Sequence, residues 1–280
     1  MYNETMPELP EVENVVRGLR SRILGQEVNR IIFLSPHLRK QQPLKARILD
    51  YFRGKRITDI RRRGKMIMVH FDGQLSWLIH LKMTGQLYLA PKNQPLDKHV
   101  HARVLFQSLK EELRFRDVRK FGFWLCLEGQ LLEKKISGLL GPEPLELKFK
   151  DFLGLLRKHP SRLIKSLLLD QKIIAGIGNI YSDEMLFRAR IRPDRRVESL
   201  TNEEIRKLHR AMRLVLKEAI ALKGSSISDY VDADGEKGHF QEKHRVYGRA
   251  GLSCRRCRAG LIRRQKVAGR STYFCPVCQK

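Results

Sequence analysis

The spacing of apolar residues divides the first half of the chain into one helical stretch and a series of strands. From Pro10 to Gly25 apolar side chains recur at the spacing of an amphipathic helix, and Gly25 stands where a helix C-cap is expected. The pattern then changes to short runs that are rich in β-branched and aromatic residues and separated by turn-like pieces. These runs are residues 65–71, 75–81, 85–90, 101–108 and 121–127. Successive short strands of this kind favour an antiparallel sandwich or barrel.

The helical period returns in the second half. The segment LLGPEPLEL, residues 139–147, contains two prolines and a glycine and resembles a linker. Beyond it, DFLGLLRKH and RLIKSLLLDQ each present an apolar face, and a tight turn leads from GIGN into a further helix. The clearest helix begins at Thr201, which forms a capping box with Glu204, and closes at Gly224. The polar stretch 225–240 is too long to be a simple connection.

The net charge indicates what such a fold binds. The 280 residues include 56 Lys and Arg against 30 Asp and Glu, which gives a formal charge of +26. Because the basic residues are spread through folded-looking sequence, nucleic acid is favoured over a membrane surface as the polyanionic partner. No apolar stretch reaches the length of a membrane span, and the N-terminus lacks the apolar core of a secretory signal. The sequence therefore predicts a protein of the cell interior.

Four of the five cysteines form one pattern. They are Cys254, Cys257, Cys275 and Cys278, in the spacing C-x2-C-x17-C-x2-C. Two such pairs fold as knuckles on a β-hairpin and bring four thiolates round one Zn²⁺. Since all four ligands are protein atoms, the predicted zinc is structural. The 17 residues between the pairs include five basic side chains, so the finger is expected to present cations.

Several motifs carry a resemblance to a known family. MPELPEVE (6–13), GPEPL (141–145), GIGNIY (176–181) and RSTYFCPVCQK (270–280) occur in the order typical of bacterial formamidopyrimidine-DNA glycosylases, the 8-oxoguanine repair enzymes. The resemblance runs from Met6 to Lys280. It implies an α+β fold, in which an N-terminal helix and an antiparallel β-sandwich domain precede a helix-two-turn-helix domain with a β-hairpin zinc finger.

The expected domain boundaries follow from these motifs and from the change of period. They are 1–140 for the catalytic β-sandwich domain, 141–150 for a linker, 151–242 for the helix-two-turn-helix DNA-binding domain, and 243–280 for the zinc finger.

The resemblance assigns the reaction to the first residues of the matched region. Members of the family cut the N-glycosidic bond with the amine of an N-terminal proline, form an iminium with deoxyribose C1′, and remove both phosphates by β- and then δ-elimination. Pro7 matches that proline, and Glu8 matches the family's catalytic carboxylate. Glu11 matches a carboxylate that supports the active-site wall, and Lys65 a catalytic-centre lysine that binds a phosphate beside the lesion.

This chemistry sets a condition on the amino terminus. An amine nucleophile needs a free lone pair, which Pro7 lacks while it is joined to Met6 by a tertiary amide. Methionine excision favours a small second residue, and a start at Met6 satisfies that preference. We therefore expect residues 1–5 to be absent from the mature protein.

The resemblance also implies a set of DNA contacts. The matching DNA-binding residues are His99, Arg119, Lys120, Asn179 and Arg270. The residues that match those filling the gap left by a flipped base are Met83, Arg119 and Phe121. The segment 225–240 matches the family's mobile loop that caps the extruded base.

Two segments depart from the family pattern. Lys82 stands where Gly is frequent, and DVRKFG replaces DPRRFG. Lys120 keeps the positive charge but loses a bidentate guanidinium, so a weaker contact is expected there.

Together these features predict a bifunctional glycosylase and abasic-site lyase that removes 8-oxoguanine and formamidopyrimidines from duplex DNA. The protein is expected to act as a monomer in the cytoplasm and to carry one structural Zn²⁺. Two alternatives stay open. A non-catalytic zinc-finger DNA-binding protein would result if Pro7 stayed blocked, and a glycosylase for oxidised pyrimidines would share the chemistry, although PELPEVE speaks against it.

Overall fold

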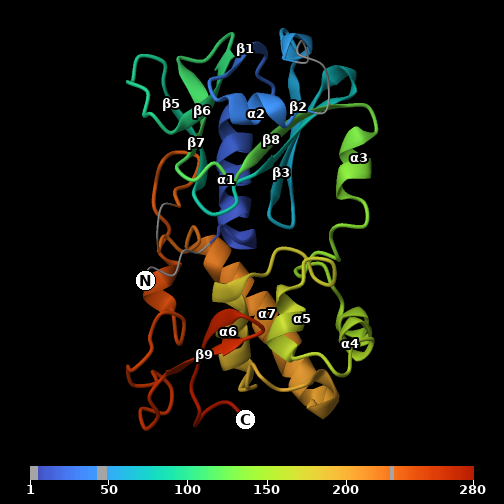
Figure 1. Ribbon diagram of the computed structural model, residues 1–280, viewed down its shortest axis with the longest axis vertical. Coiled ribbons are helices and arrows are strands. Elements are labelled where there is room, and N and C mark those ends of the chain that lie inside the picture. The colour runs from blue at the N-terminus through green and yellow to red at the C-terminus, as the bar shows by residue number, and fades with distance from the viewer. Residues whose placement is uncertain (1–5, 43–48, 228–229) are drawn as a thin grey trace. The chain divides into compact units, whose positions relative to one another are not determined.

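The computed structural model describes residues 6–42, 49–227 and 230–280, so the expectation for residues 1–5 lies outside the described residues (Figure 1). The chain divides into two compact units. The N-terminal unit comprises Met1–Ser137 and Lys223–His239, and the C-terminal unit comprises Gly138–Leu222 and Phe240–Lys280. In the part of the chain that is described, no helix is long and apolar enough to cross a membrane.

Two four-stranded antiparallel sheets and a buried helix form the N-terminal unit (Figure 1). The first sheet has the order β1-β6-β7-β5, with strands Val28–Phe33, Val100–Phe106, Glu111–Asp117 and Gly85–Pro91. The second has the order β2-β3-β4-β8, with strands Ile57–Arg63, Met66–Phe71, Leu75–His80 and Phe123–Glu128. Helix α1 (Leu9–Ile23) contacts β2 and β3 of one sheet and β5 of the other. Its apolar residues therefore join both sheets in one core.

Short helices complete this unit. They are α2 (Pro36–Lys40), α3 (Leu131–Ile136) and the 3₁₀ turns Asp50–Phe52 and Asp72–Gln74. The centre of the core is aromatic: the rings of Trp77 and Trp124 lie 5.0 Å apart on the neighbouring strands β4 and β8. The expected first helix and the five expected strands are confirmed, while β1, β2 and β7 were not expected.

Strand β7 contains a charged pair in the interior of the unit. Glu112 and Arg114 are 0% and 1% exposed, and the Arg114 Nε donates to the Glu112 carboxylate at 2.7 Å. Arg103 of β6 donates to the same carboxylate, and Arg114 also donates to the carbonyls of Pro91 and Gln94. Because every charge has partners, the strand is buried although its sequence looks polar.

Helices and a hairpin make up the C-terminal unit. The helices are α4 (Phe149–Arg157), α5 (Ile164–Leu169), α6 (Asn179–Ala189) and α7 (Asn202–Ala221), with 3₁₀ turns at Val197–Ser199 and Phe240–Lys243. Strands β9 (Arg263–Val267) and β10 (Arg270–Phe274) pair antiparallel. The expected capping box is present at α7: Glu204 N–H donates to Thr201 Oγ1, and Thr201 N–H donates to the Glu204 carboxylate. Helix α6 packs against α7, α5 and β10.

The segment Lys223–His239 makes its contacts within the N-terminal unit. Leu89 N–H of β5 donates to the Ala233 carbonyl at 2.9 Å. A Cβ at Gly18 of α1 would lie 2.7 Å from the Cβ of Ala233, so the helix needs a glycine where this segment crosses it. The sequence-based boundaries placed these residues with the helices, whereas their packing joins them to α1 and β5.

Candidate active site

Pro7 and Glu8 lie at the amino end of α1. Both are buried, and Glu8 takes the N-cap position, with its N–H donating to Glu11 Oε2 at 2.9 Å. A buried carboxylate beside a helix N-terminus faces the positive end of the helix dipole. The fold therefore places Pro7 and the buried carboxyl group of Glu8 at one end of helix α1.

Glu11 joins this end of α1 to the segment 223–239. Its Oε1 accepts from Ser225 N–H at 2.7 Å, and its carbonyl accepts from the Tyr230 hydroxyl at 3.1 Å. Gly224 has φ +79°, and a Cβ there would lie 2.6 Å from Glu11 Oε1. Glycine at 224 is thus required by both the backbone and the close carboxylate. Burial and the charge of Glu11 raise the pKa of Tyr230 well above its ordinary value, so its hydroxyl stays a donor.

Lys65 is buried at the start of β3, and His80 lies beside it at the end of β4. Met66, the next residue along, pairs with His80 across the two strands. Burial lowers the pKa of His80 to about 3, with smaller contributions from the charges of Lys82 and Lys65. Lys82 N–H donates to His80 Nδ1 at 2.9 Å, so the neutral ring carries its proton on Nε2. The site thus holds an ammonium and an N–H donor together.

The turn between β7 and β8 carries Arg119, Lys120 and Phe121. Asp117, 1% exposed, fixes it: the carboxylate accepts from Gly122 N–H at 2.7 Å and from Arg119 N–H at 3.2 Å. The guanidinium of Arg119 lies 4.6 Å from the ring centre of Phe121, whose side chain is 52% exposed. Lys120 has φ +57°, the left-handed conformation that a tight turn needs.

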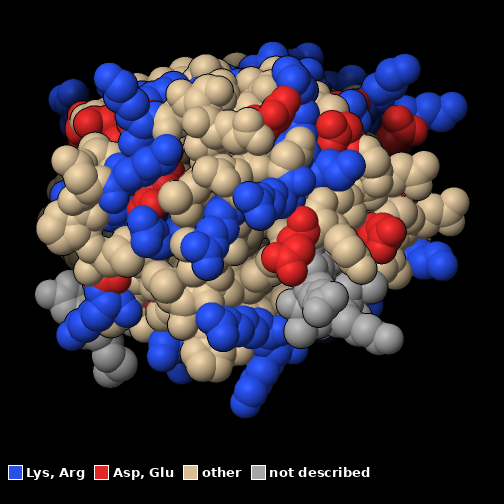
Figure 2. Space-filling view, turned by 90° about the horizontal axis from the view of Figure 1, so that it is seen from above, with Lys and Arg blue, Asp and Glu red and all other residues tan. Residues whose placement is uncertain are grey.

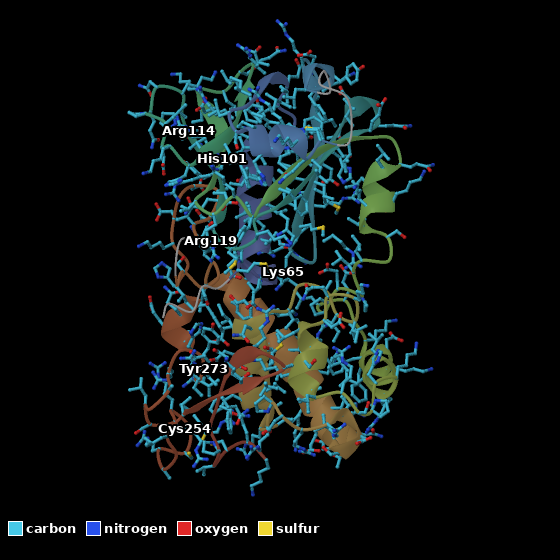
Figure 3. The ribbon with its side chains drawn as sticks, in the orientation of Figure 1. Lys65, His101, Arg114, Arg119, Cys254 and Tyr273 are labelled. Atoms are coloured by element: carbon cyan, nitrogen blue, oxygen red, sulfur yellow. The ribbon has the colours of Figure 1, made fainter. Side chains whose placement is uncertain are left out.

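Met83 and His99 are tied to the same turn. Thr84, which follows Met83, donates its hydroxyl to Asp117 at 2.5 Å, and Arg119 N–H donates to that hydroxyl at 3.1 Å. The carbonyl of His99 accepts from Asp117 N–H at 2.9 Å. Figure 3 shows Lys65 and Arg119 towards the lower end of the N-terminal unit, below His101 and Arg114. The residues expected to fill the gap left by a flipped base, Met83, Arg119 and Phe121, therefore lie on segments that are held by the buried carboxylate of Asp117.

In the C-terminal unit, Asn179 is the first residue of α6. The turn before it is held by Gln171, which accepts from Gly176 N–H and donates to the Ile177 carbonyl, both at 2.8 Å. Asn179 Nδ2 donates to the carbonyl of Ser271 at 2.9 Å. Since Arg270 precedes Ser271 at the exposed start of β10, the expected phosphate contacts Asn179 and Arg270 lie close together.

A buried ion pair fastens β10 to α5 and α6. Lys165 Nζ lies 2.7 Å from Asp183, and both side chains are 0% exposed. Lys165 also donates to Thr272 Oγ1 at 2.8 Å, and Tyr273 N–H donates to Asp183 at 2.9 Å. Burial raises the pKa of Asp183, and the ammonium of Lys165 opposes that shift. The ion pair thus fixes the strand on which Arg270 stands.

The four cysteines form one compact group. Sγ of Cys254 lies 3.8 Å from Sγ of Cys278, Sγ of Cys257 lies 3.8 Å from Sγ of Cys275, and all four lie within 4.8 Å of one another. Four thiolates at about 2.3 Å from a tetrahedral zinc would stand about 3.8 Å apart, so the group fits Zn²⁺. A Cβ at Gly260 would lie 3.0 Å from Cys275 Sγ, which explains the glycine in this turn. The expected structural zinc site is confirmed as a site that could hold one such ion.

Three regions of the chain match models of known protein families. Residues 6–124 match the formamidopyrimidine-DNA glycosylase N-terminal domain, residues 140–231 match its H2TH domain, and residues 251–280 match the zinc finger found in FPG and IleRS. The formamidopyrimidine-DNA glycosylase of Heliobacterium modesticaldum is 48% identical over 98% of this chain and 100% of its own length. That of Carboxydothermus hydrogenoformans is 43% identical over the same shares.

Solved structures of the same family are similar to this chain over almost its whole length. A Lactococcus lactis FPG mutant in complex with Fapy-dG containing DNA superposes with a TM-score of 0.89, at 39% identity, over 98% of this chain and 100% of that one. The Lactococcus lactis Fpg in complex with abasic site containing DNA gives 0.88 at 38% identity, over 98% and 99%. The fold and the site thus define the class: a two-sheet unit with an H2TH unit and a zinc finger, as in DNA glycosylases. The chain belongs to the formamidopyrimidine-DNA glycosylase family.

The sequence did not reveal the residues that hold other site residues in position. His80 stands in an apolar run, Lys165 and Asp183 stand in helical stretches, and Asp117 stands among other charged residues, so none of them gives a sign of its partners. The signal that could have found them is the charge itself, because a buried charged residue in such a run needs a specific partner.

Proposed function

We propose that this protein is a bifunctional DNA glycosylase that removes oxidised purines from duplex DNA and then cleaves the strand at the abasic site. The observation that carries the proposal is the buried Pro7–Glu8 pair at the amino end of α1, in a chain that belongs to this family over 98% of its length. A secondary amine and a carboxyl group held side by side are the parts that imine-forming glycosylase chemistry needs.

In this reaction the Pro7 nitrogen attacks C1′ of the damaged nucleotide, the bond from C1′ to the oxidised base breaks, and the base leaves with the proton released from the Pro7 amine. Glu8 delivers a proton to the sugar ring oxygen as the ring opens, and the nitrogen lone pair then forms the iminium. Loss of the C2′ proton into the iminium expels the 3′ phosphate by β-elimination, and a second proton loss, at C4′, expels the 5′ phosphate by δ-elimination. The nitrogen must carry a free lone pair, and the reactive form is therefore the one that starts at Pro7.

Lys65 and His80 supply the phosphate contacts of the N-terminal unit. A buried ammonium beside a neutral imidazole N–H offers a charged and an uncharged donor to the phosphate oxygens. Asn179 and Arg270 supply contacts of the C-terminal unit, from a helix N-terminus and from the zinc hairpin. His99 and Lys120 add contacts from the N-terminal unit, and the contact of Lys120 is weaker than that of an arginine.

Met83, Arg119 and Phe121 fill the space that the flipped base leaves in the duplex. Phe121 is exposed and stacked with Arg119, so an apolar ring and a cation enter together. The segment 223–239, held to α1 through Glu11, covers the extruded base. Lys and Arg side chains are spread over the face seen from above in Figure 2, and the net charge of +26 suits contact with the phosphates of a duplex. We place the protein, as a monomer, in the cytoplasm with the DNA.

Borohydride reduction of the protein with an 8-oxoguanine duplex tests the proposal. Protein that starts at Pro7 should be trapped covalently on the DNA, whereas the form that keeps residues 1–6 should bind abasic DNA without being trapped or cutting it. Glu8→Gln should slow base excision by roughly 10²–10⁴-fold. No trapping with a free Pro7 would refute the mechanism, and faster excision of thymine glycol than of 8-oxoguanine would refute the substrate class.

A further inference from the structure

The C-terminal unit contains a cavity at the carboxyl end of α6 that the proposed reaction does not use. Its volume is about 270 Å³. The lining residues are Glu184, Phe187, Arg188, Arg245, Arg255 and Arg256. Among the residues that the structure describes, four arginines therefore face this space with one carboxylate. Such a lining indicates an anion as the occupant.

The carboxylate is already satisfied by the backbone. Glu184 is 3% exposed and accepts from the N–H groups of Arg245, Val246 and Tyr247, at 3.0, 2.9 and 2.9 Å. These bonds hold the chain that leads into the zinc finger. Glu184 keeps its negative charge and offsets part of the positive charge of the four guanidinium groups, so the lining of the cavity retains an excess of positive charge.

The carbonyls at the end of α6 are also engaged. Arg256 donates to the Phe187 carbonyl at 2.9 Å and to the Arg188 carbonyl at 3.4 Å, and its guanidinium lies 4.2 Å from the Phe187 ring centre. The negative end of the helix dipole is thereby countered by a fixed cation. An anion in the cavity would meet that cation before it met the carbonyls.

The arginines are positioned mainly by neutral groups. Arg255 donates to the carbonyls of Glu242 and His244, at 3.0 and 2.9 Å. Arg188 is the exception, since it pairs with Glu218 at 2.7 Å. Burial lowers the pKa of the adjacent Arg249, and the charges of Arg255 and Arg245 lower it further. Planar guanidinium groups that are held in place and crowd one another match the oxygens of a phosphate group.

The cavity is separate from the phosphate contacts at the start of α6. Arg188 follows Asn179 by nine positions, which places it about 13 Å further along the helix. We propose that this cavity is a second phosphate-binding site, independent of the reaction. Its phosphate comes either from the backbone of a further DNA segment or from a free phosphate compound.

The test uses the zinc-loaded full-length protein and inorganic phosphate as the probe. The side-chain Nε–H signals of the arginines are followed by ¹H–¹⁵N NMR during the titration. The variant is the double substitution Arg188→Gln and Arg245→Gln, which keeps the backbone bonds to Glu184. The matched control is Arg210→Gln, which removes the same kind of charge from an exposed position of α7 that does not line the cavity. The backbone amide spectrum shows whether each variant keeps the folded structure.

Phosphate should shift the Arg255 signal saturably in the wild type and in Arg210→Gln. The affinity for phosphate, read from that signal, should be at least about tenfold lower in the double variant, because two charge-assisted hydrogen bonds to the phosphate are lost. No saturable shift in the wild type, or equal affinity in the double variant with an intact spectrum, would overturn the proposal.

A second arm identifies the source of the phosphate. Duplexes that just cover the lesion site and duplexes twice as long are bound at several salt concentrations. If DNA is the source, the salt dependence of binding to the long duplex should be smaller for the double variant than for the wild type, and the salt dependence on the short duplex should be the same for both. If a free compound is the source, the double variant and Arg210→Gln should bind duplexes of both lengths with the same affinity and salt dependence. The double variant should still bind inorganic phosphate more weakly.

Discussion

Replacing Asp117 by Asn is expected to disorder the turn that carries Arg119 and Phe121. The carboxylate accepts bonds from Thr84, Arg119 and Gly122, and only 1% of the residue is exposed. Asn has the same shape but a single acceptor oxygen. Whichever way the amide is turned, an NH₂ group faces a donor that had an oxygen before, so at least one bond to a charged acceptor is lost.

The expected magnitude follows from that loss. A hydrogen bond to a charged group contributes about 1.5–3 kcal/mol, and the remaining donor stays buried. We therefore expect the free energy of unfolding of Asp117→Asn to fall by about 2 kcal/mol, as a lower urea midpoint with an unchanged slope. Gly122→Ala should have a similar effect, since its Cβ would lie 2.7 Å from the Phe115 ring and 3.0 Å from Asp117 Oδ2.

The functional assay is wedge insertion. A duplex with 2-aminopurine beside an abasic-site analogue should brighten on binding the wild type, and should brighten less with Asp117→Asn. The control is Asp50→Asn, the same substitution at an exposed position of the first 3₁₀ turn. If Asp117→Asn matched Asp50→Asn in both unfolding energy and fluorescence, the argument that this carboxylate organises the turn would be wrong.

Three further predictions concern the buried charges and the metal. Lys165→Met should lower the free energy of unfolding by about 3–5 kcal/mol, because it leaves Asp183 buried without its cation. At lower pH part of this stability should return, because Asp183 takes up a proton. Urea unfolding at pH 8 and pH 6 measures the loss at each pH, and equal losses at the two pH values would contradict the prediction. The folded protein lowers the pKa of His80 to about 3, below its unfolded value of about 6.5, so this histidine contributes stability above pH 6.5 that is lost as the pH falls. In the wild type this lowers the free energy of unfolding by roughly 1.4 kcal/mol per pH unit between pH 6 and pH 4, and His80→Gln should not show this decrease. The same pH profile in both proteins would count against a buried neutral imidazole. Chelation should release one zinc per chain and weaken DNA binding, because the hairpin that carries Arg270 loses its metal; unchanged DNA affinity of metal-free protein would show that the finger folds without it.

The sequence was most informative where local chemistry matches the fold. Helices α1 and α7 carry their own periodicity and caps, and the cysteine spacing defines its cluster. Strands β1 and β2 were not predicted, because register shifts at Val28/Arg30 and at Ile57/Asp59 break the alternation of buried and exposed residues that is typical of a strand. Strand β7 was missed because its charged residues look exposed, whereas Arg114 is buried against Glu112 and against the carbonyls of Pro91 and Gln94, which are distant in sequence.

The candidate site divides in the same way. Pro7, Lys65 and Asn179 could be named from motifs, whereas His80 is recognisable only once β3 and β4 are paired. The role of Asp117 depends on Thr84, 33 positions earlier, and that of Lys165 on Thr272, 107 positions later. Contacts over such separations follow from topology, which a single sequence does not display.

The bond pattern of Glu11 has a consequence for timing. One oxygen is committed to the residue that precedes the helix, and the other to Ser225. A displacement of Ser225 is therefore transmitted through this side chain to the amino end of α1. In the reaction that we propose, a base that fails to seat beneath the segment would leave Pro7 out of line, so that an undamaged nucleotide would not be attacked.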